Sequence, residues 1–112
     1  MVIRLEDIQF IGYHGVYPEE QEKGNTFLVT VSLIMPDNQA VVTDDLQDTV
    51  DYQRVYALVA EQMSVPSLLL EHVAGRIRTV LQTNYPHAEV HVQIKKKNPP
   101  VGGHVAWATI EL

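Results

Sequence analysis

Three consecutive lysines, Lys95 to Lys97, stand near the end of the sequence in the stretch IKKKNPPVGGH, directly before two prolines and a pair of glycines. They are three of only eight Lys and Arg residues in a chain whose formal net charge is −6. Such a run can be a solvated surface patch, a binding site for an anion, or the setting of one lysine that transfers protons.

The residues that precede the run distinguish its middle lysine. Every second residue from Val90 to Ile94 is apolar, and a period of two puts Lys96 on the same face if the strand extends that far. An amine moved out of water holds its proton less tightly, which suits it to proton transfer near neutral pH. The alternative is a strand-end lysine whose ammonium group reaches back to solvent. Lys95 and Lys97 are expected to be solvated charges.

A second candidate is Glu71, a single carboxylate in the apolar stretch LLLEHVAGRI, one turn into an expected helix. A carboxylate near a helix N-terminus is stabilised by the helix dipole, and that effect alone explains such a residue. If the same carboxylate lies in a pocket, it can accept paired N–H hydrogen bonds from a guanidinium-like heterocycle edge. The sequence leaves both interpretations open.

The segment GYHGVYPEEQEKG adds His14, Tyr17 and three glutamates at positions 19, 20 and 22. Glycines near His14 indicate a tightly turned or closely approached backbone. Glutamates in a loop usually face solvent, so the residues alone do not select one of the three. Tyr52 follows Asp51, a candidate helix N-cap, and is either a core aromatic or a stacking and hydroxyl-donating group.

The spacing of apolar residues predicts the elements that position these candidates. Strands are expected over residues 2–13, 26–35, 88–95 and 104–112, and helices over 52–63 and 67–84, with Ser67 as the second N-cap. The segments 14–25 and 36–51 are predicted to be loops. The order β-β-α-α-β-β predicts an α+β fold, a four-stranded antiparallel sheet with two helices on one face. No repeat or linker divides residues 1–112, so a single domain is predicted.

Composition excludes several classes of function. The chain has no cysteine, which excludes disulfides, thiolate zinc sites and cysteine nucleophiles. Its five histidines form no His-x-His pair, and no phosphate loop, dinucleotide fingerprint or nucleophile elbow is present. The acidic balance argues against nucleic-acid binding. No signal peptide or membrane span is evident, so a cytoplasmic protein without cofactor or metal is expected, either an acid–base enzyme or a binding module.

Four segments together resemble the dihydroneopterin aldolase family: GYHGVYPEEQEKGNTFLVTV, DTVDYQRVY, LLLEHVAGRI and VQIKKKNPPVGGH, in this order. The resemblance implies the tunnelling fold and assembly into rings, commonly stacked as octamers, with active sites between subunits. It also implies cleavage of a pterin substrate, 7,8-dihydroneopterin, to 6-hydroxymethyl-7,8-dihydropterin and glycolaldehyde in folate biosynthesis. Neither a metal nor a Schiff base is expected.

The resemblance also implies roles for individual residues. The lysine of the family's Lys-x-Asn-Pro-Pro pattern falls on Lys96, the expected general acid/base. Glu71 would anchor the 2-amino group and ring N3–H of the pterin, with the backbone near Leu70 against the ring carbonyl. Glu20, six residues after the histidine of the Gly-Tyr-His-Gly motif, would hold a catalytic water or the side-chain hydroxyls.

One further expected catalytic residue comes from a neighbouring subunit. Tyr52 matches a tyrosine that covers the pterin across the interface and helps to protonate the intermediate. Val50 and Asp51, which precede it, are included among the substrate-contacting residues. The family varies at position 51, so the role of Asp51 stays open.

Other functions use the same residues. An epimerase of dihydroneopterin or its triphosphate would share the proton chemistry, although a triphosphate would require Lys95 or Lys97 to face inward. A non-catalytic pterin-binding, ring-forming subunit is disfavoured because every expected catalytic residue is present. A zinc-dependent pterin synthase of the same fold is disfavoured because the histidine cluster is missing.

Overall fold

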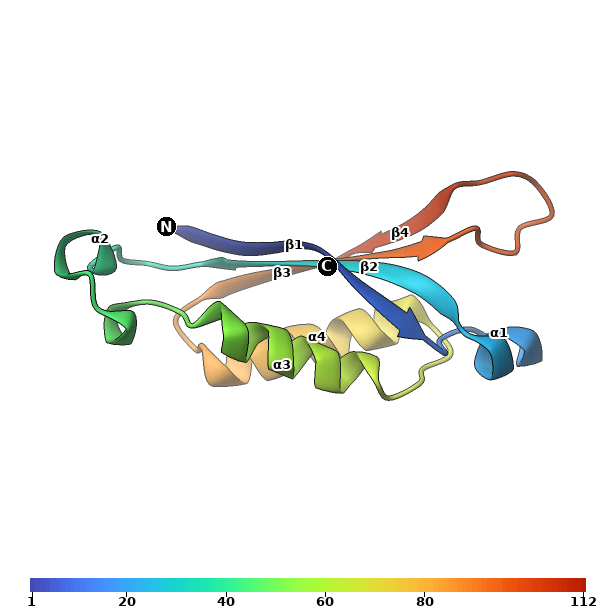
Figure 1. Ribbon diagram of the computed structural model, residues 1–112, viewed down its shortest axis with the longest axis horizontal. Helices are drawn as coiled ribbons and strands as arrows, with labels where there is room; N and C mark the ends of the chain where they lie inside the picture. Colours follow the sequence, from blue (N-terminus) through green and yellow to red (C-terminus); the bar gives the residue numbers. More distant parts are fainter.

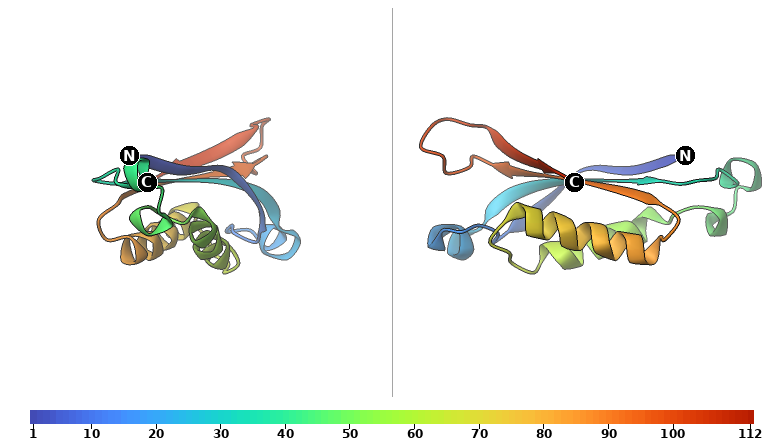
Figure 2. Two further views of the ribbon diagram at one scale, coloured as in Figure 1. Left: turned by 60° about the vertical axis from the view of Figure 1, so that its left-hand side comes forward. Right: turned by 180° about the vertical axis from the view of Figure 1, so that it is seen from behind.

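The computed structural model describes residues 1–112 and has one antiparallel sheet in the order β1-β2-β3-β4. The strands are β1 (Val2–Gly12), β2 (Asn25–Ile34), β3 (Glu89–Lys97) and β4 (Trp107–Glu111). Helices α3 (Tyr52–Met63) and α4 (Leu70–Asn84) lie side by side under one face of this sheet, and the opposite face carries no helix (Figures 1 and 2). The predicted α+β fold and element order are confirmed.

Buried apolar residues alternate with more exposed residues along the two central strands, β2 and β3, and form the sheet side of the core. Phe27, Val29, Val31 and Leu33 of β2 and Val90, Val92 and Ile94 of β3 point toward the helices and are buried. The helices contribute Val55, Leu58, Val59 and Met63 from α3, and Val73, Ala74, Ile77 and Leu81 from α4. The apolar positions recur every three or four residues in each helix, so each presents one continuous stripe to the sheet.

An irregularity in β1 keeps Leu5 and Ile8, which lie on either side of it, on the core side. The pairing with β2 shifts between Leu5 and Ile8, and Asp7 takes a positive φ of 50° there. The displaced Asp7 N–H donates to Thr30 Oγ1 at 3.0 Å instead of joining the strand ladder. Such a bulge adds one residue and bends the strand, which accompanies the curvature of the sheet toward α1 in Figure 1.

Both predicted loops contain short helices. The first includes α1 (Pro18–Lys23), and the second includes α2 (Ala40–Thr43) and a 3-10 helix η1 (Leu46–Asp48). Pro18 at the first helical position favours α1, because proline has the required φ and lacks an N–H that would be unpaired there.

The predicted N-cap at Ser67 is wrong, because α4 begins at Leu70. The Ser67 hydroxyl is instead hydrogen-bonded to the side chains of His72 and Arg76. Glu71 is therefore the second residue of α4 rather than one turn inside it. Asp51 is confirmed as the N-cap of α3, since its Oδ1 accepts a hydrogen bond from the Gln53 N–H at 3.0 Å.

Ile77 of α4 is fully buried in the core, so shortening its side chain should strongly lower the stability of the fold. Ile77→Ala should lower the free energy of unfolding by about 2–5 kcal/mol, because it removes apolar contacts and leaves a cavity. Urea denaturation at fixed protein concentration measures the change. Val42→Ala is the control, since that side chain is exposed and should cost less than about 0.5 kcal/mol. Equal effects of the two changes would contradict this account of the core.

Candidate active site

Lys96 lies on the core-facing side of β3, as its spacing predicts. The strand continues to Lys97, and Lys96 pairs with Phe27 of β2 and Ala108 of β4. Its side chain is only 10% exposed. Lys95 lies on the helix-free face, with its Nζ 4.0 Å from Asp7 Oδ1, and Lys97 is exposed. The three adjacent lysines therefore have three different environments.

The ammonium group of Lys96 forms an ion pair with the Glu20 carboxylate. Glu20 is the third residue of α1, and its side chain is 12% exposed. Its Oε2 contacts Lys96 Nζ, while its Oε1 accepts a hydrogen bond from the Tyr17 N–H at 3.3 Å. Because water screens the pair poorly, the attraction is stronger than in a surface ion pair. The structure thus singles out Glu20 among the three glutamates of this segment.

Gly15 permits the approach of Glu20. It has a φ of 152°, and a Cβ at this position would lie 2.4 Å from Glu20 Cδ. The Gly15 carbonyl also accepts a hydrogen bond from Gln21 Nε2 at 3.0 Å. A side chain at position 15 would therefore displace the carboxylate that faces Lys96.

The ion pair borders a pocket of about 240 Å³. Three segments enclose the pocket: the β1–α1 region, the start of α4 and the β3–β4 end of the sheet. Its lining residues are Gly15, Val16, Tyr17, Glu20, Leu68, Leu69, Leu70, Glu71, Lys96, Pro99, Pro100, Ala108 and Ile110. Four predicted site residues, Glu20, Leu70, Glu71 and Lys96, thus meet in one place, combining an ion pair and an exposed carboxylate with an apolar wall.

The other predicted residues line a different groove. Val50, Asp51 and Tyr52 border a space of about 590 Å³ together with residues 2–4 of β1. This groove lies at the start of α3, toward the end of the molecule that carries α2, whereas α1 lies at the opposite end (Figure 1). Tyr52 is 61% exposed, so it is not a core aromatic. One chain alone does not bring Tyr52 to Lys96.

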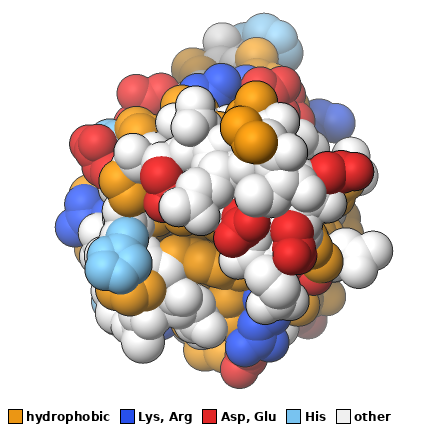
Figure 3. All heavy atoms as spheres, turned by 90° about the vertical axis from the view of Figure 1, so that its left-hand side faces the viewer, with side chains coloured by type: hydrophobic (Ala, Val, Ile, Leu, Met, Phe, Trp, Pro, Cys, Tyr) orange, Lys and Arg blue, Asp and Glu red, His pale blue; other side chains and the backbone are white.

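The end of the molecule near this groove combines apolar and acidic side chains, which intermingle on the surface in Figure 3. Val41, Val42 and Leu46 are exposed in the segment that includes α2 and η1. Three aspartates at positions 44, 45 and 48 belong to the same segment. This end of the molecule therefore exposes apolar side chains among carboxylates.

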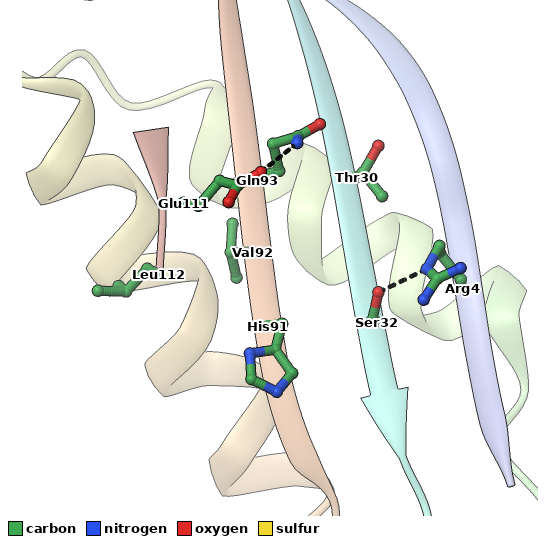
Figure 4. Close-up of a pocket in the computed structure, with 8 residues that line it drawn as sticks. All are labelled: Arg4, Thr30, Ser32, His91, Val92, Gln93, Glu111 and Leu112. Carbon is green, nitrogen blue, oxygen red and sulfur yellow. Dashed lines mark hydrogen bonds between the residues drawn. The ribbon is translucent and has the colours of Figure 1, made fainter. Parts of the chain in front are cut away.

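The helix-free face of the sheet has its own hollow, of about 420 Å³ (Figure 4). Its lining is mainly polar, with Arg4 Nε donating to Ser32 Oγ at 2.8 Å and Gln93 Nε2 donating to Glu111 Oε1 at 2.7 Å. None of the predicted site residues lies there. No group of three or more His, Asp or Glu side chains could hold a metal ion. No helix is long and apolar enough to cross a membrane.

Two residues near the pocket have environments that sequence analysis missed. His14 is 1% exposed, and its Nδ1 accepts a hydrogen bond from the Ser67 N–H at 3.1 Å. Arg76 of α4 donates hydrogen bonds to the α3–α4 loop, and burial lowers the pKa of its guanidinium. The glycines near His14 indicated close packing, but nothing in the sequence identified the partner.

Comparison with known proteins gives consistent matches over nearly the whole chain. The family model described as dihydroneopterin aldolase matches residues 3–112. The dihydroneopterin aldolase of Staphylococcus epidermidis is 38% identical over 113 residues, covering 99% of this chain and 93% of that protein. That of Streptococcus pyogenes serotype M1 is 40% identical over 112 residues, covering 98% and 94%.

A solved structure supports the same fold. The crystal structure of Escherichia coli dihydroneopterin aldolase in complex with neopterin has a TM-score of 0.89 to this chain, at 19% sequence identity. The match covers 100% of this chain and 96% of that chain. The order of elements and their packing are therefore shared, although few residues are identical.

The contact between Gly15 and Glu20 predicts that Gly15→Ala is destabilising. The new Cβ would displace the carboxylate and strain the backbone, at a cost of about 1–3 kcal/mol in the free energy of unfolding. Gly75→Ala in α4 is the matched control, because no atom lies within 4 Å of its added Cβ. That change should be neutral or stabilising by up to about 1 kcal/mol.

A double-mutant cycle separates the clash from the backbone strain. Adding Glu20→Ala removes the side chain that the new Cβ would meet, so Gly15→Ala should cost less in that background. Chemical denaturation of the four proteins measures the coupling. Additive effects would show that the close contact with Glu20 has no energetic consequence.

Proposed function

Because this chain belongs to the dihydroneopterin aldolase family, we propose that it cleaves 7,8-dihydroneopterin in the pocket that contains Lys96, Glu20 and Glu71. The aldolase function in folate biosynthesis follows from the family and from relatives at about 40% identity over nearly the full length. The products would be 6-hydroxymethyl-7,8-dihydropterin and glycolaldehyde, with residues 1–112 acting as one domain. The observation that carries the site assignment is the shielded Lys96–Glu20 pair beside Glu71.

The cleavage needs proton transfers at two positions. A base removes the proton from the side-chain hydroxyl whose carbon becomes the aldehyde of glycolaldehyde. The electrons of the broken carbon–carbon bond move into the ring imine, which is conjugated to that bond. A proton is then delivered to the carbon that remains attached to the ring. Because the ring itself accepts the electrons, this route requires neither a metal nor a Schiff base.

Lys96 is the proposed proton carrier. Its ammonium group borders the pocket and is oriented by Glu20, which is itself fixed by the Tyr17 N–H. General acid–base catalysis requires such a group within hydrogen-bond reach of the reacting atoms, directly or through one water. Glu20 would hold that water or the side-chain hydroxyls of the substrate.

Glu71 and the start of α4 are the proposed anchor for the pterin ring. The Glu71 carboxylate is exposed beside the pocket and can accept two hydrogen bonds, from the 2-amino group and from ring N3–H. The first N–H groups of a helix have no partner within the helix, so the backbone near Leu70 can bind the ring carbonyl. The recognition elements therefore match a neutral heterocycle with adjacent donors and an acceptor.

The pocket that contains Lys96 and the groove that contains Tyr52 lie apart in a single chain, and this separation supports an oligomer. We propose that Tyr52, with Val50 and Asp51, completes the pocket of a neighbouring subunit in a ring of four, and that two rings stack as an octamer. The outer strands of the open sheet are β1 and β4, and their free edges can pair between subunits. In such a ring the exposed Tyr52 side chain would cover the pterin and help to protonate the intermediate.

The epimerase alternative has less support for a triphosphate substrate than for an unphosphorylated one. A triphosphate would need extra cations in the pocket, but Lys95 lies on the helix-free face and Lys97 is exposed outside the pocket lining. Epimerisation of the unphosphorylated substrate would use the same groups. Product analysis separates that reaction from cleavage, since only cleavage releases glycolaldehyde.

The proposed roles predict different defects for two variants. Lys96→Ala should lower the rate of glycolaldehyde release by about 100-fold or more while pterin binding is retained. Glu71→Ala should weaken pterin binding by about 10- to 100-fold, because charged hydrogen bonds to the ring are lost. Product assays and neopterin fluorescence titration measure the two effects, with the neighbouring Lys95→Ala and Glu19→Ala as controls.

The wild-type protein should remain active in the presence of a metal chelator and of borohydride. If it releases no glycolaldehyde from dihydroneopterin, the proposed aldolase site is wrong. If Lys95→Ala is as damaging as Lys96→Ala, the identification of the proton carrier is wrong.

A shared site predicts complementation between two inactive variants. In a mixed oligomer of Lys96→Ala and Tyr52→Ala subunits, a site that takes Lys96 from one variant and Tyr52 from the other is intact. Random mixing should give about a quarter of the wild-type activity, because each site draws two independent subunits. Differently tagged, co-expressed subunits purified as mixed assemblies provide the sample. No activity above that of the separate variants would contradict the shared site.

A further inference from the structure

The two loops on either side of the pocket are joined directly through Ser67. The Gly15 N–H donates to the Ser67 carbonyl at 3.0 Å, and the Ser67 N–H donates to His14 Nδ1 at 3.1 Å. Residues 14 and 15 belong to the segment that leads to Glu20, and Ser67 belongs to the segment that leads to Glu71. This pair of hydrogen bonds therefore connects the half of the pocket that contains the ion pair with the half proposed to bind the ring.

The side chain of Ser67 is held from the other side by α4. Arg76 Nη2 donates to Ser67 Oγ at 3.0 Å, and that oxygen lies 2.7 Å from His72 Nδ1. Arg76 also donates to the carbonyls of Gln62 and Val65, at 2.9 and 2.7 Å. Arg76 thus fixes the α3–α4 loop to α4, and the hydrogen bonds of Ser67 to residues 14 and 15 connect that loop to the β1–α1 segment.

His14 is enclosed where it makes this contact. Its ring meets the edge of Phe27 at a centroid distance of 5.2 Å, and Phe27 is the cross-strand partner of Lys96. A Cβ on Gly12 would lie 2.9 Å from the ring, so the backbone of β1 also closes around it. The ring therefore contacts strand β2 next to the proposed proton carrier while it accepts the hydrogen bond from Ser67.

We infer that His14 is a positioning residue for the active site, which sets the Glu71 half of the pocket against the Lys96–Glu20 half through its hydrogen bond with Ser67. The inference rests on the proposed roles of those three charged residues. His14 does not line the pocket, so it acts through Ser67 and not on the substrate.

The hydrogen bond requires a neutral imidazole, because Nδ1 can accept from the Ser67 N–H only when it carries no proton. Burial lowers the pKa of His14, and the charges that face it, Arg76 from α4 and Lys96 from β3, lower it further. The Met63 backbone raises the pKa of His14, but it only partly offsets the lowering. The environment therefore favours the form that binds Ser67.

Two variants of nearly equal shape test the inference. His14→Asn keeps an acceptor close to the position of Nδ1, whereas His14→Leu fills a similar volume with no acceptor. We expect kcat/KM of the leucine variant to be lower than that of the asparagine variant by about tenfold, since a buried N–H loses its partner. The loss should fall mainly on kcat, with neopterin affinity changed less than about threefold, because Glu71 and the backbone near Leu70 still bind the ring and only their position relative to Lys96 changes.

A stability control separates positioning from general destabilisation. Val90→Ala creates a cavity in the core away from the pocket and should lower the melting temperature without lowering kcat/KM comparably. Equal kcat/KM values for His14→Asn and His14→Leu, or losses that follow melting temperature across all three variants, would overturn the inference. If Lys96→Ala and Glu71→Ala are impaired in the same experiment, such a result rejects only the role of His14. If they are fully active, the site assignment itself fails.

The pH dependence of stability provides a second measurement. A histidine whose pKa is lowered by folding stabilises the protein fully above its ordinary pKa of 6.5, and this contribution is lost as the pH falls toward the folded-state pKa. The difference in unfolding free energy between wild type and His14→Asn should therefore shrink below about pH 6.5. A pH-independent difference would show that His14 is not a buried neutral acceptor.

Discussion

The ion pair between Lys96 and Glu20 is the interaction on which the candidate site depends. Shielding either charge alone from water would carry a large desolvation cost, so each is tolerated because the other is present. The fold supplies Lys96 from a central strand and Glu20 from α1, and Gly15 allows the carboxylate to lie against the backbone. The conformation of the β1–α1 segment is therefore coupled to the position of one lysine.

The same geometry supports the proposal that one chain alone forms only part of the active site. The pocket beside Lys96 measures about 240 Å³, below the range of roughly 300–1,000 Å³ that is usual for ligand sites. Tyr52, which the family resemblance assigns to catalysis, lies in a separate groove toward the other end of a molecule 52 Å long. A neighbouring subunit would supply both the missing wall and the tyrosine, which makes assembly a requirement of the proposed chemistry.

Local periodicity was sufficient to predict the strands and the two long helices, because each depends on residues close together in the sequence. It predicted the inward orientation of Lys96 only if the strand extended beyond residue 95, as β3 does. The N-cap at Ser67 was predicted wrongly for the opposite reason. The Ser67 N–H and hydroxyl bond to His14, His72 and Arg76, and His14 is 53 residues away. The choice of Glu20 among three glutamates likewise depends on a contact across 76 residues with Lys96. Family resemblance could identify such positions, whereas spacing could not.

Pairing a lysine with a carboxylate also suits a reaction on a neutral substrate. The ammonium group and the carboxylate together carry no net charge. When Lys96 gives its proton to the carbon left on the ring, the pair carries one negative charge, and the proton taken from a substrate hydroxyl restores the neutral pair. A protonated His14 would add a third positive group beside Lys96 and Arg76 and would remove the acceptor for Ser67. Keeping His14 neutral therefore preserves both the charge balance around Lys96 and the geometry of the loop that precedes Glu71.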